Sequence, residues 1–405
     1  MSSHASPSSS SVGGPALKAV FVGLGLLGLA ATWGRMLSDG SFSLIEEVLG
    51  GDNKLPGSDY DLVSSFCGIG PLDNLARTLV VFFWEAIDGS HPKTSAAGIY
   101  MAGQMAPVIV VQYLDGLRQG NGSSTLKISI WWFIFAAAAI GASGAVWGVV
   151  SLVTSPLLSS SIALGALQEA SLPYSPRAAA LLLPATYVNF IGSMIIMSLP
   201  VPSMVSSNFR QWAIIIWNLF PIGISAFVHL GEPLWSALLP AASSRDSGHT
   251  AHLRVVRYLS TSAMALGFAV HVGVAAISLS AALFPAVFAP GYAELLHPLS
   301  VAVPPIAVEK AQSPGDGIWS FVVWDQVFGF SFVMLLFLAQ LQNAMRFSDR
   351  FGSFSWAKSC VLGFLSSFLI GPGVTIVAIS WLRDEVLYGA DKKETRNGKA
   401  IGRRN

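Results

Sequence analysis

Carboxyl groups inside long apolar segments are the residues of this 405-residue chain that could do chemistry. A charged side chain at the centre of a bilayer costs about 2.5–3.5 kcal/mol on insertion scales, so an acid in such a segment is a functional candidate. Four acids are our catalytic candidates: Glu232, Asp325, Asp88 and Asp115. Glu232 and Asp325 lead, because each lies in a segment long enough to span a membrane.

Glu232 ends a polar stripe on a helix predicted over residues 211–238. Polar side chains recur there every seven residues and share one face if Pro221 only kinks the helix: Gln211, Asn218, Ser225 and Glu232. His229 joins this face. Single amides in a membrane helix often just bond a neighbouring helix, whereas five polar groups ending in a carboxylate indicate a cavity wall.

Asp325 lies among aromatic residues on a helix predicted over residues 318–342. Its face carries Phe321, Phe328, Phe332 and Asn343, with Trp324 adjacent. An acid beside aromatic rings suits chemistry on a cation. The alternative is an aromatic belt at the membrane interface, since Trp319 and Trp324 lie near the start of the helix.

Asp88 and Asp115 belong to two further polar faces. At 100° per residue, a short helix over 72–88 gathers five residues on a third of its circumference: Asp73, Arg77, Trp84, Glu85 and Asp88. Here the plain alternative is an i,i+4 ion pair between Asp73 and Arg77, with Asp88 at the interface. Asp115 shares a face with Tyr100, Gln104 and Arg118, and snorkelling of the helix end explains it equally well.

Acids and aromatic rings in an apolar cavity suit acid-initiated cyclisation of a prenyl chain. Burial raises a carboxyl pKa, which keeps the proton available to a general acid. A desolvated aromatic face stabilises a cation by about 2 kcal/mol. The substrate-binding candidates are Trp84, Gln104, Trp217, Asn218, His229, Trp324 and Phe328. No metal or cofactor is expected, because the chain lacks an Asp-rich diphosphate motif and has a single H-x-x-H, at His249 and His252.

The composition places these residues in a membrane protein. The chain is 53% hydrophobic and 11% charged, with a mean hydropathy of +0.60, whereas soluble domains carry roughly 25% charged residues. The net charge of +1 gives no electrostatic footprint for nucleic acid. We therefore expect membrane lipid and a lipophilic small molecule as partners, with pathway enzymes possible in the same membrane.

Apolar segments of about 20 residues predict an all-α, polytopic transmembrane bundle of eight or nine helices. The segments are 19–37, 72–88, 96–117, 128–153, 178–199, 211–238, 259–287, 318–342 and 361–382. They form a single domain over residues 15–385, between a disordered Ser-rich tail (1–14) and a basic polar tail (386–405). Gly23, Gly25 and Gly28 in the first helix, and Gly144 with Gly148, predict close helix packing. The polar faces are expected to meet at one cavity.

Three strings give the chain a resemblance to a known family. They are Phe66-Cys67-Gly68-Ile69 with Pro71-Leu72-Asp73, Val81-Phe82-Phe83-Trp84 to Asp88-Gly89, and Asp115-Gly116-Leu117-Arg118 with Gly120-Asn121. They resemble those of fungal membrane proteins of secondary-metabolite clusters, among them the meroterpenoid cyclases of the ascochlorin, ascofuranone and macrophorin pathways. The family more often has Glu at the position of Asp115 and Pro near that of Glu85. The resemblance implies motif positions at Asp73, Asp88, Asp115 and Arg118 but assigns no proton donor.

This resemblance implies a membrane-bound terpene cyclase of isomerase or lyase type, in the endoplasmic reticulum of a fungus. Its substrate would be a prenylated aromatic (meroterpenoid) precursor, cyclised after protonation of an epoxide or olefin without a metal. The alternative is a non-catalytic transporter or scaffold protein of a secondary-metabolite pathway. A scaffold should tolerate loss of every intramembrane acid, whereas a cyclase should not.

Overall fold

All the regular elements in the computed structural model are helices, within the residues it describes: 12–238, 248–348 and 353–389. The all-α fold class is therefore confirmed for these ranges. The predicted tails, 1–14 and 386–405, lie largely outside them.

The helices of the first half begin with α1 (Gly14–Leu29), continued by a π-helical turn into α2 (Arg35–Ser38). They go on with α3 (Ser41–Gly50), α4 (Gly70–Ile87), α5 (Pro92–Leu117), α6 (Leu126–Ala138), α7 (Ile140–Thr154), α8 (Leu164–Ser171), α9 (Pro176–Ala180), α10 (Leu182–Thr186) and α11 (Ser193–Met197). The second half holds α12 (Ser207–Asn218), α13 (Phe220–Leu238), α14 (Gly248–Leu283), α15 (Tyr292–Leu295), α16 (Pro298–Ala302), α17 (Pro314–Met345), α18 (Trp356–Ile370) and α19 (Pro372–Gly389).

Five helices of the described chain are long and apolar enough to cross a membrane: Gly14–Ser38, Pro92–Leu117, Pro176–Met197, His249–Leu283 and Pro314–Met345. A sixth candidate is the pair α12 and α13, which is bent by 62°. The predicted count of eight or nine spanning helices is therefore not confirmed.

Breaks in the backbone explain the lower count. The predicted segment 128–153 is two helices, because Ala139 has a φ of 65° and ends α6 before α7 begins. Segment 361–382 is divided in the same way at Gly371, whose φ is 97°, and Pro372 then starts α19. The 72–88 segment forms α4, in which three charged residues interrupt the apolar run.

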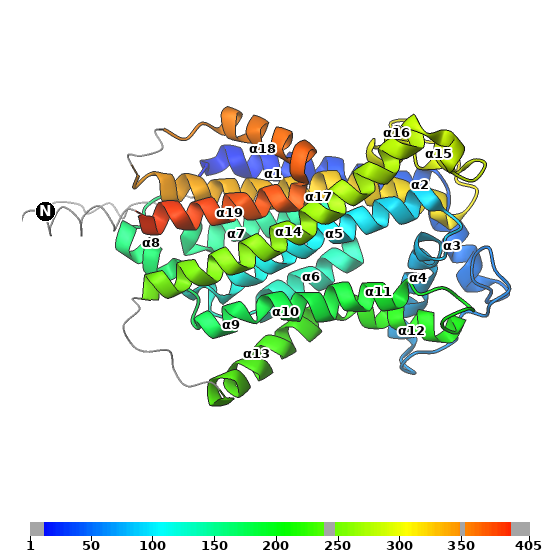
Figure 1. Ribbon diagram of the computed structural model, residues 1–405, viewed down its shortest axis with the longest axis horizontal. Coiled ribbons are helices and arrows are strands. Elements are labelled where there is room, and N and C mark those ends of the chain that lie inside the picture. The colour runs from blue at the N-terminus through cyan, green and yellow to red at the C-terminus, as the bar shows by residue number, and fades with distance from the viewer. Residues whose placement is uncertain (1–11, 239–247, 349–352, 390–405) are drawn as a thin grey trace, which may run out of the picture.

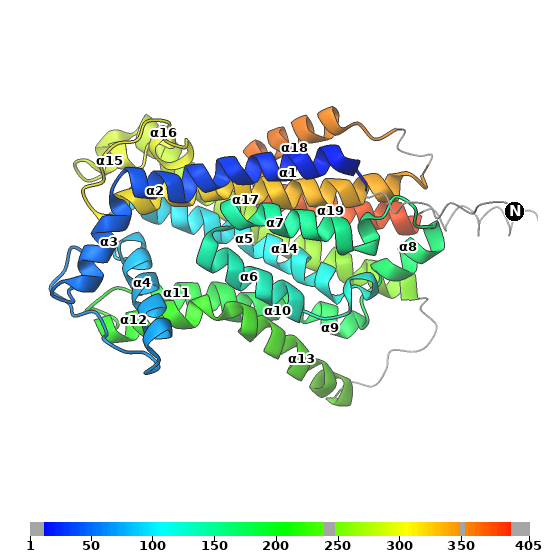
Figure 2. The same ribbon diagram turned by 180° about the vertical axis from the view of Figure 1, so that it is seen from behind.

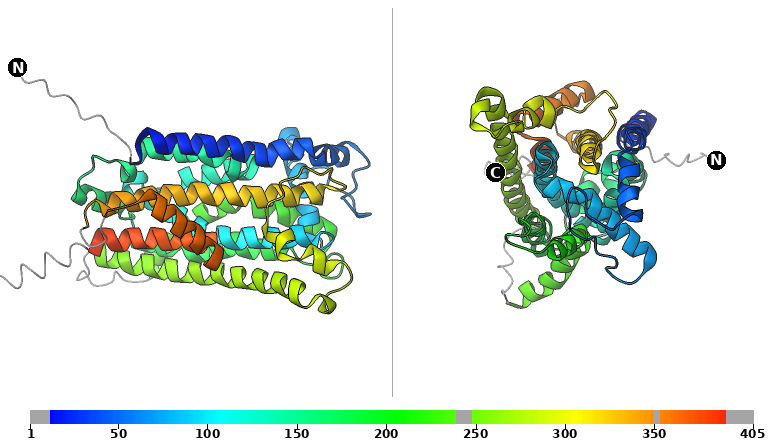
Figure 3. Two further views of the ribbon diagram at one scale, coloured as in Figure 1. Left: turned by 90° about the horizontal axis from the view of Figure 1, so that it is seen from above. Right: turned by 90° about the vertical axis from the view of Figure 1, so that its right-hand side faces the viewer.

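Helix α17 is the central element of the bundle and packs against α7, α19, α5 and α4. Figure 1 and the reverse view in Figure 2 show the long helices lying side by side, with α3, α4 and α12 gathered at one end. In Figure 3, α17 runs the length of the bundle between α1 and α19. Helix α17 therefore joins helices from the first and second halves of the chain.

The predicted close packing of small residues is confirmed between α1 and α7 at Gly25, Gly28 and Gly148, but not at Gly23, where an added Cβ would meet nothing within 4 Å; Gly144 faces Phe332 of α17. A Cβ added to Gly25 would lie within van der Waals overlap of Ala145, and one added to Gly28 would overlap the carbonyl of Gly141. On α7, Gly148 leaves the space that the ring of Phe21 fills. The two helices thus approach at backbone distance, as small residues allow in a membrane.

Candidate active site

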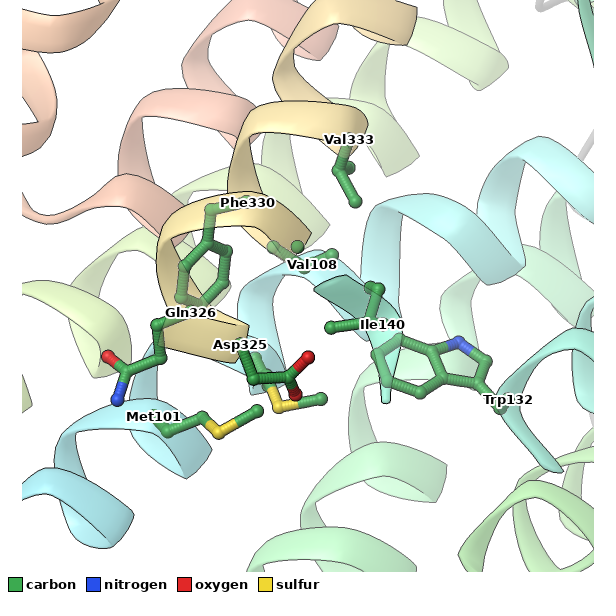
Figure 4. Close-up of a pocket in the computed structure, with 10 residues that line it drawn as sticks. Met101, Val108, Trp132, Ile140, Asp325, Gln326, Phe330 and Val333 are labelled. Carbon is green, nitrogen blue, oxygen red and sulfur yellow. The ribbon is translucent and has the colours of Figure 1, made fainter. Parts of the chain in front are cut away.

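Asp325 is the predicted acid that the structure places in an apolar pocket. It lies on α17 with 5% of its surface exposed. The pocket is lined by Met101, Met105, Val108, Trp132, Ile140, Asp325, Gln326, Gly329, Phe330 and Val333. Figure 4 shows the carboxyl group directed towards Ile140 and Trp132. The free volume is about 10 Å³, which is on the order of one water molecule.

The break between α6 and α7 holds this carboxyl group. The backbone N–H of Gly141, in the first turn of α7, donates a hydrogen bond of 2.6 Å to Oδ1 of Asp325. Ala139, two residues earlier, has φ 65° and ψ 140°, a conformation that a residue with a Cβ rarely adopts. Such strain, of order 1–3 kcal/mol, concentrates at functional sites. The unusual backbone conformation at Ala139 therefore places the first turn of α7 within hydrogen-bond distance of Asp325.

Gly28 on α1 lies directly against the carbonyl group of Gly141. Any side chain at Gly28 would collide with the carbonyl group of Gly141, whereas Gly23 on the same helix has open space around its Cα. Thr32 adds a hydrogen bond of 2.7 Å to the carbonyl of Gly28. The position of the Gly141 N–H thus depends on the absence of a Cβ at residue 28.

A methyl group at Gly28 is accordingly expected to disturb the site. Gly28→Ala should push Gly141 away from Asp325 and lower any turnover that depends on Asp325 by about 10²-fold, since displacements near 1 Å can have that effect. Gly23→Ala is the matched control and should leave turnover unchanged. Product formation by the two variants, at equal amounts of folded protein, checks this. Equal turnover of both would show that α1 does not position the site.

Aromatic rings lead away from the pocket. Trp132, a pocket residue, contacts Phe220 with ring centroids 5.6 Å apart, and Phe220 contacts Phe190 at 4.8 Å. Phe190 contacts Trp217 at 5.5 Å, and Trp217 contacts Phe83 at 5.1 Å. We call these five residues the aromatic run. The aromatic run links the predicted residue Trp217 to the pocket. Its member in the pocket, Trp132, was not predicted from the sequence.

The predicted neighbours on α17 lie beside the pocket and do not line it. Trp324 stacks on Phe328 at 5.9 Å and donates its Nε1–H to the carbonyl of Pro305 at 3.1 Å. Phe328 is buried. Among the predicted site residues only Asp325 lines this pocket, so the expected meeting of the polar faces at one cavity is not what the structure shows.

The polar stripe on residues 211–232 is not one helix face. The 62° bend between α12 and α13 separates its two halves, because the chain breaks at Leu219 and does not merely kink at Pro221. Asn218 bonds the carbonyl of Ile214 in its own helix.

The second half of that stripe lies on α13. Glu232 is partly exposed and accepts hydrogen bonds from Ser175 (3.1 Å) and Ser236 (3.2 Å). His229 is exposed, with Nε2 at 3.0 Å from the hydroxyl of Thr125. Their catalytic and binding roles stay predictions.

The other predicted residues have structural partners. Asp88 follows the end of α4 and accepts hydrogen bonds from the N–H and hydroxyl of Ser90. Gln104 joins three helices: its amide donates to the carbonyl of Gly267 at 2.7 Å and accepts from the N–H of Gly373 at 3.1 Å. Trp84 is buried at the α4 end of the bundle.

The prediction of an ion pair between Asp73 and Arg77 is wrong. Asp73 accepts hydrogen bonds from the backbone of Phe66, Cys67 and Gly68 and from the Ser65 hydroxyl. These donors, that of Cys67 foremost, hold the pKa of Asp73 well below its usual range. Arg77 instead binds Leu49 and Asn53. The first string of the resemblance is thus a loop tied to the start of α4.

Asp115 belongs to a buried ionic cluster that the sequence did not predict. Arg118, fully buried, binds Asp115 and Asp384, each at 2.9 Å. Asp384 also pairs with Arg383 at 2.7 Å and lies 3.6 Å from His252. Burial opposes the charge of Asp384, but Arg118 and Arg383 prevail and hold its pKa well below the usual range. The one signal was the Arg383-Asp384-Glu385 run directly after an apolar segment.

Within the parts of the chain that the structure describes, no three His, Cys, Asp or Glu residues lie close enough together to hold a metal ion.

Comparison with known proteins decides the family. Residues 17–388 match the CtvD domain family. The chain belongs to the CtvD family. It is 22% identical to terpene cyclase ascI of Acremonium egyptiacum over 389 residues, which is 94% of this chain and 95% of the relative.

Two further proteins similar to this chain are also named as terpene cyclases. Terpene cyclase sdgD of Emericella nidulans is 23% identical over 92% of this chain and 95% of its own length. Terpene cyclase ctvD of Aspergillus terreus is 28% identical over 50% of this chain and 56% of its own length. No solved structure matches. The resemblance drawn from the three strings is therefore confirmed.

Proposed function

We propose that this CtvD-family chain is a membrane-bound terpene cyclase that starts cyclisation of a prenylated aromatic precursor with the proton of Asp325. The observation that carries the proposal is the buried acid at an apolar pocket from which an aromatic run leads away. The names of the relatives support the reaction class. Five long apolar helices fit a membrane enzyme with a lipophilic substrate, and we place it in the endoplasmic reticulum.

The proposed chemistry is an isomerisation. Asp325 gives its proton to the terminal olefin carbon or epoxide oxygen, and the chain's π electrons close carbon–carbon bonds behind the cation. The cation is quenched by loss of a C–H proton to water, or by bonding to a phenol oxygen whose O–H proton passes to water. That proton restores the Asp325 acid, so substrate and product are isomers. The aspartate left behind is stabilised by the Gly141 N–H and the N-terminus of α7. A side chain supplies the proton, so the proposal draws on no metal or cofactor.

The pocket has to widen before it can take a substrate. Its free volume is about 10 Å³, whereas sites for molecules of this size are roughly 300–1,000 Å³. Met101 and Met105 line it, and methionine side chains change rotamer readily and fill irregular gaps. We propose that the prenyl chain displaces these side chains, so that its end reaches Asp325 and its middle lies along the aromatic run.

The proposal is tested by feeding microsomes that contain the chain with the linear prenylated precursor and with its terminal epoxide. A cyclic product is expected from at least one of the two, and none from microsomes that lack the chain. If neither precursor is converted, the cyclase proposal fails.

Loss of a ring from the aromatic run should alter the products. Trp132→Leu and Trp217→Leu remove a face that stabilises a cation by about 2 kcal/mol, which corresponds to roughly 30-fold in rate. Both should therefore slow turnover and release prematurely quenched or wrongly cyclised products. Trp235→Leu is the control, because Trp235 is exposed on α13. Unchanged product patterns in both run variants would remove the aromatic run from the mechanism.

A further inference from the structure

Arg210 is a buried arginine without a carboxylate at ion-pair distance; the charge of Asp88 acts on it from farther away. It lies in the first turn of α12 and is 3% exposed. Within the residues that the structure describes, no acid forms an ion pair with it. Its Nη2 donates to the carbonyl of Leu199 at 2.6 Å, and its Nε–H has no partner. The other two fully buried arginines, Arg118 and Arg383, both pair with Asp384.

The surroundings of Arg210 supply a second unused donor and a flat wall. Its guanidinium carbon lies 5.1 Å from the centre of the Trp84 ring, and Tyr60 meets the Trp84 ring edge-on at 6.2 Å. Trp84 is 1% exposed, and its Nε1–H also has no hydrogen-bond partner. Other buried donors of the described chain, such as Nε1 of Trp132 and Trp319, also lack a partner. Here one of the two donors belongs to a buried guanidinium with no carboxylate at ion-pair distance, which an anionic acceptor would stabilise.

We propose that Arg210 and Trp84 bind an anionic oxygen group on the aromatic head of the substrate, a carboxylate or an ionised phenol. Guanidinium matches a planar oxyanion with two parallel hydrogen bonds, and the indole N–H offers a third donor. This inference rests on the proposed function. It adds that the substrate is an acidic aromatic whose ring is recognised apart from the reacting end of its chain.

The aromatic run begins next to this head site, because Trp84 belongs to the apolar cluster against which Phe83 and Trp217 pack. Phe83 precedes Trp84 on α4 and contacts Trp217, and the run continues from there to Trp132 in the Asp325 pocket. Figures 1 and 2 show α4 and α12 at the end of the bundle, where a polar head would stay near the membrane surface. The apolar chain would then extend inwards to Asp325.

Binding to the detergent-purified full chain tests the head site without turnover. The probes are a farnesylated 4-hydroxybenzoic acid and its methyl ester, followed by quenching of tryptophan fluorescence. The wild type should bind the acid at least tenfold more tightly than the ester. Arg210→Gln should abolish this preference while leaving ester binding unchanged. Arg257→Gln, which removes an exposed arginine paired with Glu385, should retain it.

A second variant covers the case in which Arg210→Gln fails to fold. Trp84→Phe keeps the ring under the guanidinium but removes one donor, and should reduce the preference for the acid roughly fivefold. Equal binding of acid and ester by the wild type, or an undiminished preference in the folded variants, would overturn the proposal.

A lipid phosphate is the other possible source of the oxyanion. Phosphatidic acid in phosphatidylcholine vesicles should not displace the acid probe; displacement at equal concentration would assign the site to a lipid headgroup and overturn the substrate assignment. If the acid is bound selectively but never cyclised, the proposed function fails while the head site stands.

Discussion

Asp325→Asn is expected to lower product formation by at least 10²- to 10⁴-fold while leaving the amount of folded protein unchanged. The amide keeps the shape of the side chain and a carbonyl oxygen for the Gly141 N–H, but it has no acidic proton to give. A general acid typically contributes a factor of this size. Product analysis with the precursor that the wild type converts measures the effect.

Two substitutions make this result specific to Asp325. Glu46→Gln changes an exposed acid of α3 and should have no effect. Glu232→Gln changes the other leading candidate, which is partly exposed and bonded to two serines, and should retain most of the activity. An active Asp325→Asn variant together with an inactive Glu232→Gln variant would place the proton donor on α13 instead.

Asp384→Asn is expected to have the largest effect on stability. It leaves Arg118 and Arg383 buried with only Asp115 to balance them, and breaking a buried ion pair costs about 3–5 kcal/mol. The apparent melting temperature in detergent should fall by roughly 4–6 °C. Glu385→Gln is the matched control at the next residue: its pair with Arg257 is partly exposed and is worth about 1 kcal/mol or less. Equal shifts in both variants would contradict a special role of the cluster.

The same cluster predicts a pH dependence. The pKa of Asp384 is lower in the folded protein than in the unfolded chain, so its contribution to stability is complete above the unfolded pKa of about 4 and is lost as the pH falls. The difference in melting temperature between wild type and Asp384→Asn should stay constant from about pH 8 to 5 and shrink below about pH 4.

The elements that the sequence predicted well are those in which local pattern and structure agree. The long apolar runs of α1, α5, α14 and α17 carry their own backbone hydrogen bonds, so length and hydropathy suffice to find them. Asp325, which the structure places at a pocket, was singled out because an acid among aromatic residues stands out on an apolar helix; its catalytic role stays a prediction. The small residues of α1 and α7 predicted that the two helices pack closely, and the structure shows this contact at Gly28 and Gly141.

The features that were missed depend on contacts between distant segments. The helix break at Ala139 falls at the last of four alanines, with no proline or glycine at that position, and the turn that follows contacts Gly28 and Asp325. Arg118 and Asp384 are 266 residues apart in the chain, and no local pattern pairs them. The seven-residue stripe up to Glu232 failed because the bend at Leu219 changes the periodicity on which it depended.

The most direct test of the central claim is the mass and structure of what the purified protein alone makes from the linear prenylated precursor or its epoxide. Protonation by Asp325 followed by loss of a proton predicts a cyclic isomer of unchanged mass, formed by the wild type and not by Asp325→Asn. An unchanged precursor, or a product differing by two hydrogens or an oxygen atom, would contradict acid-initiated cyclisation.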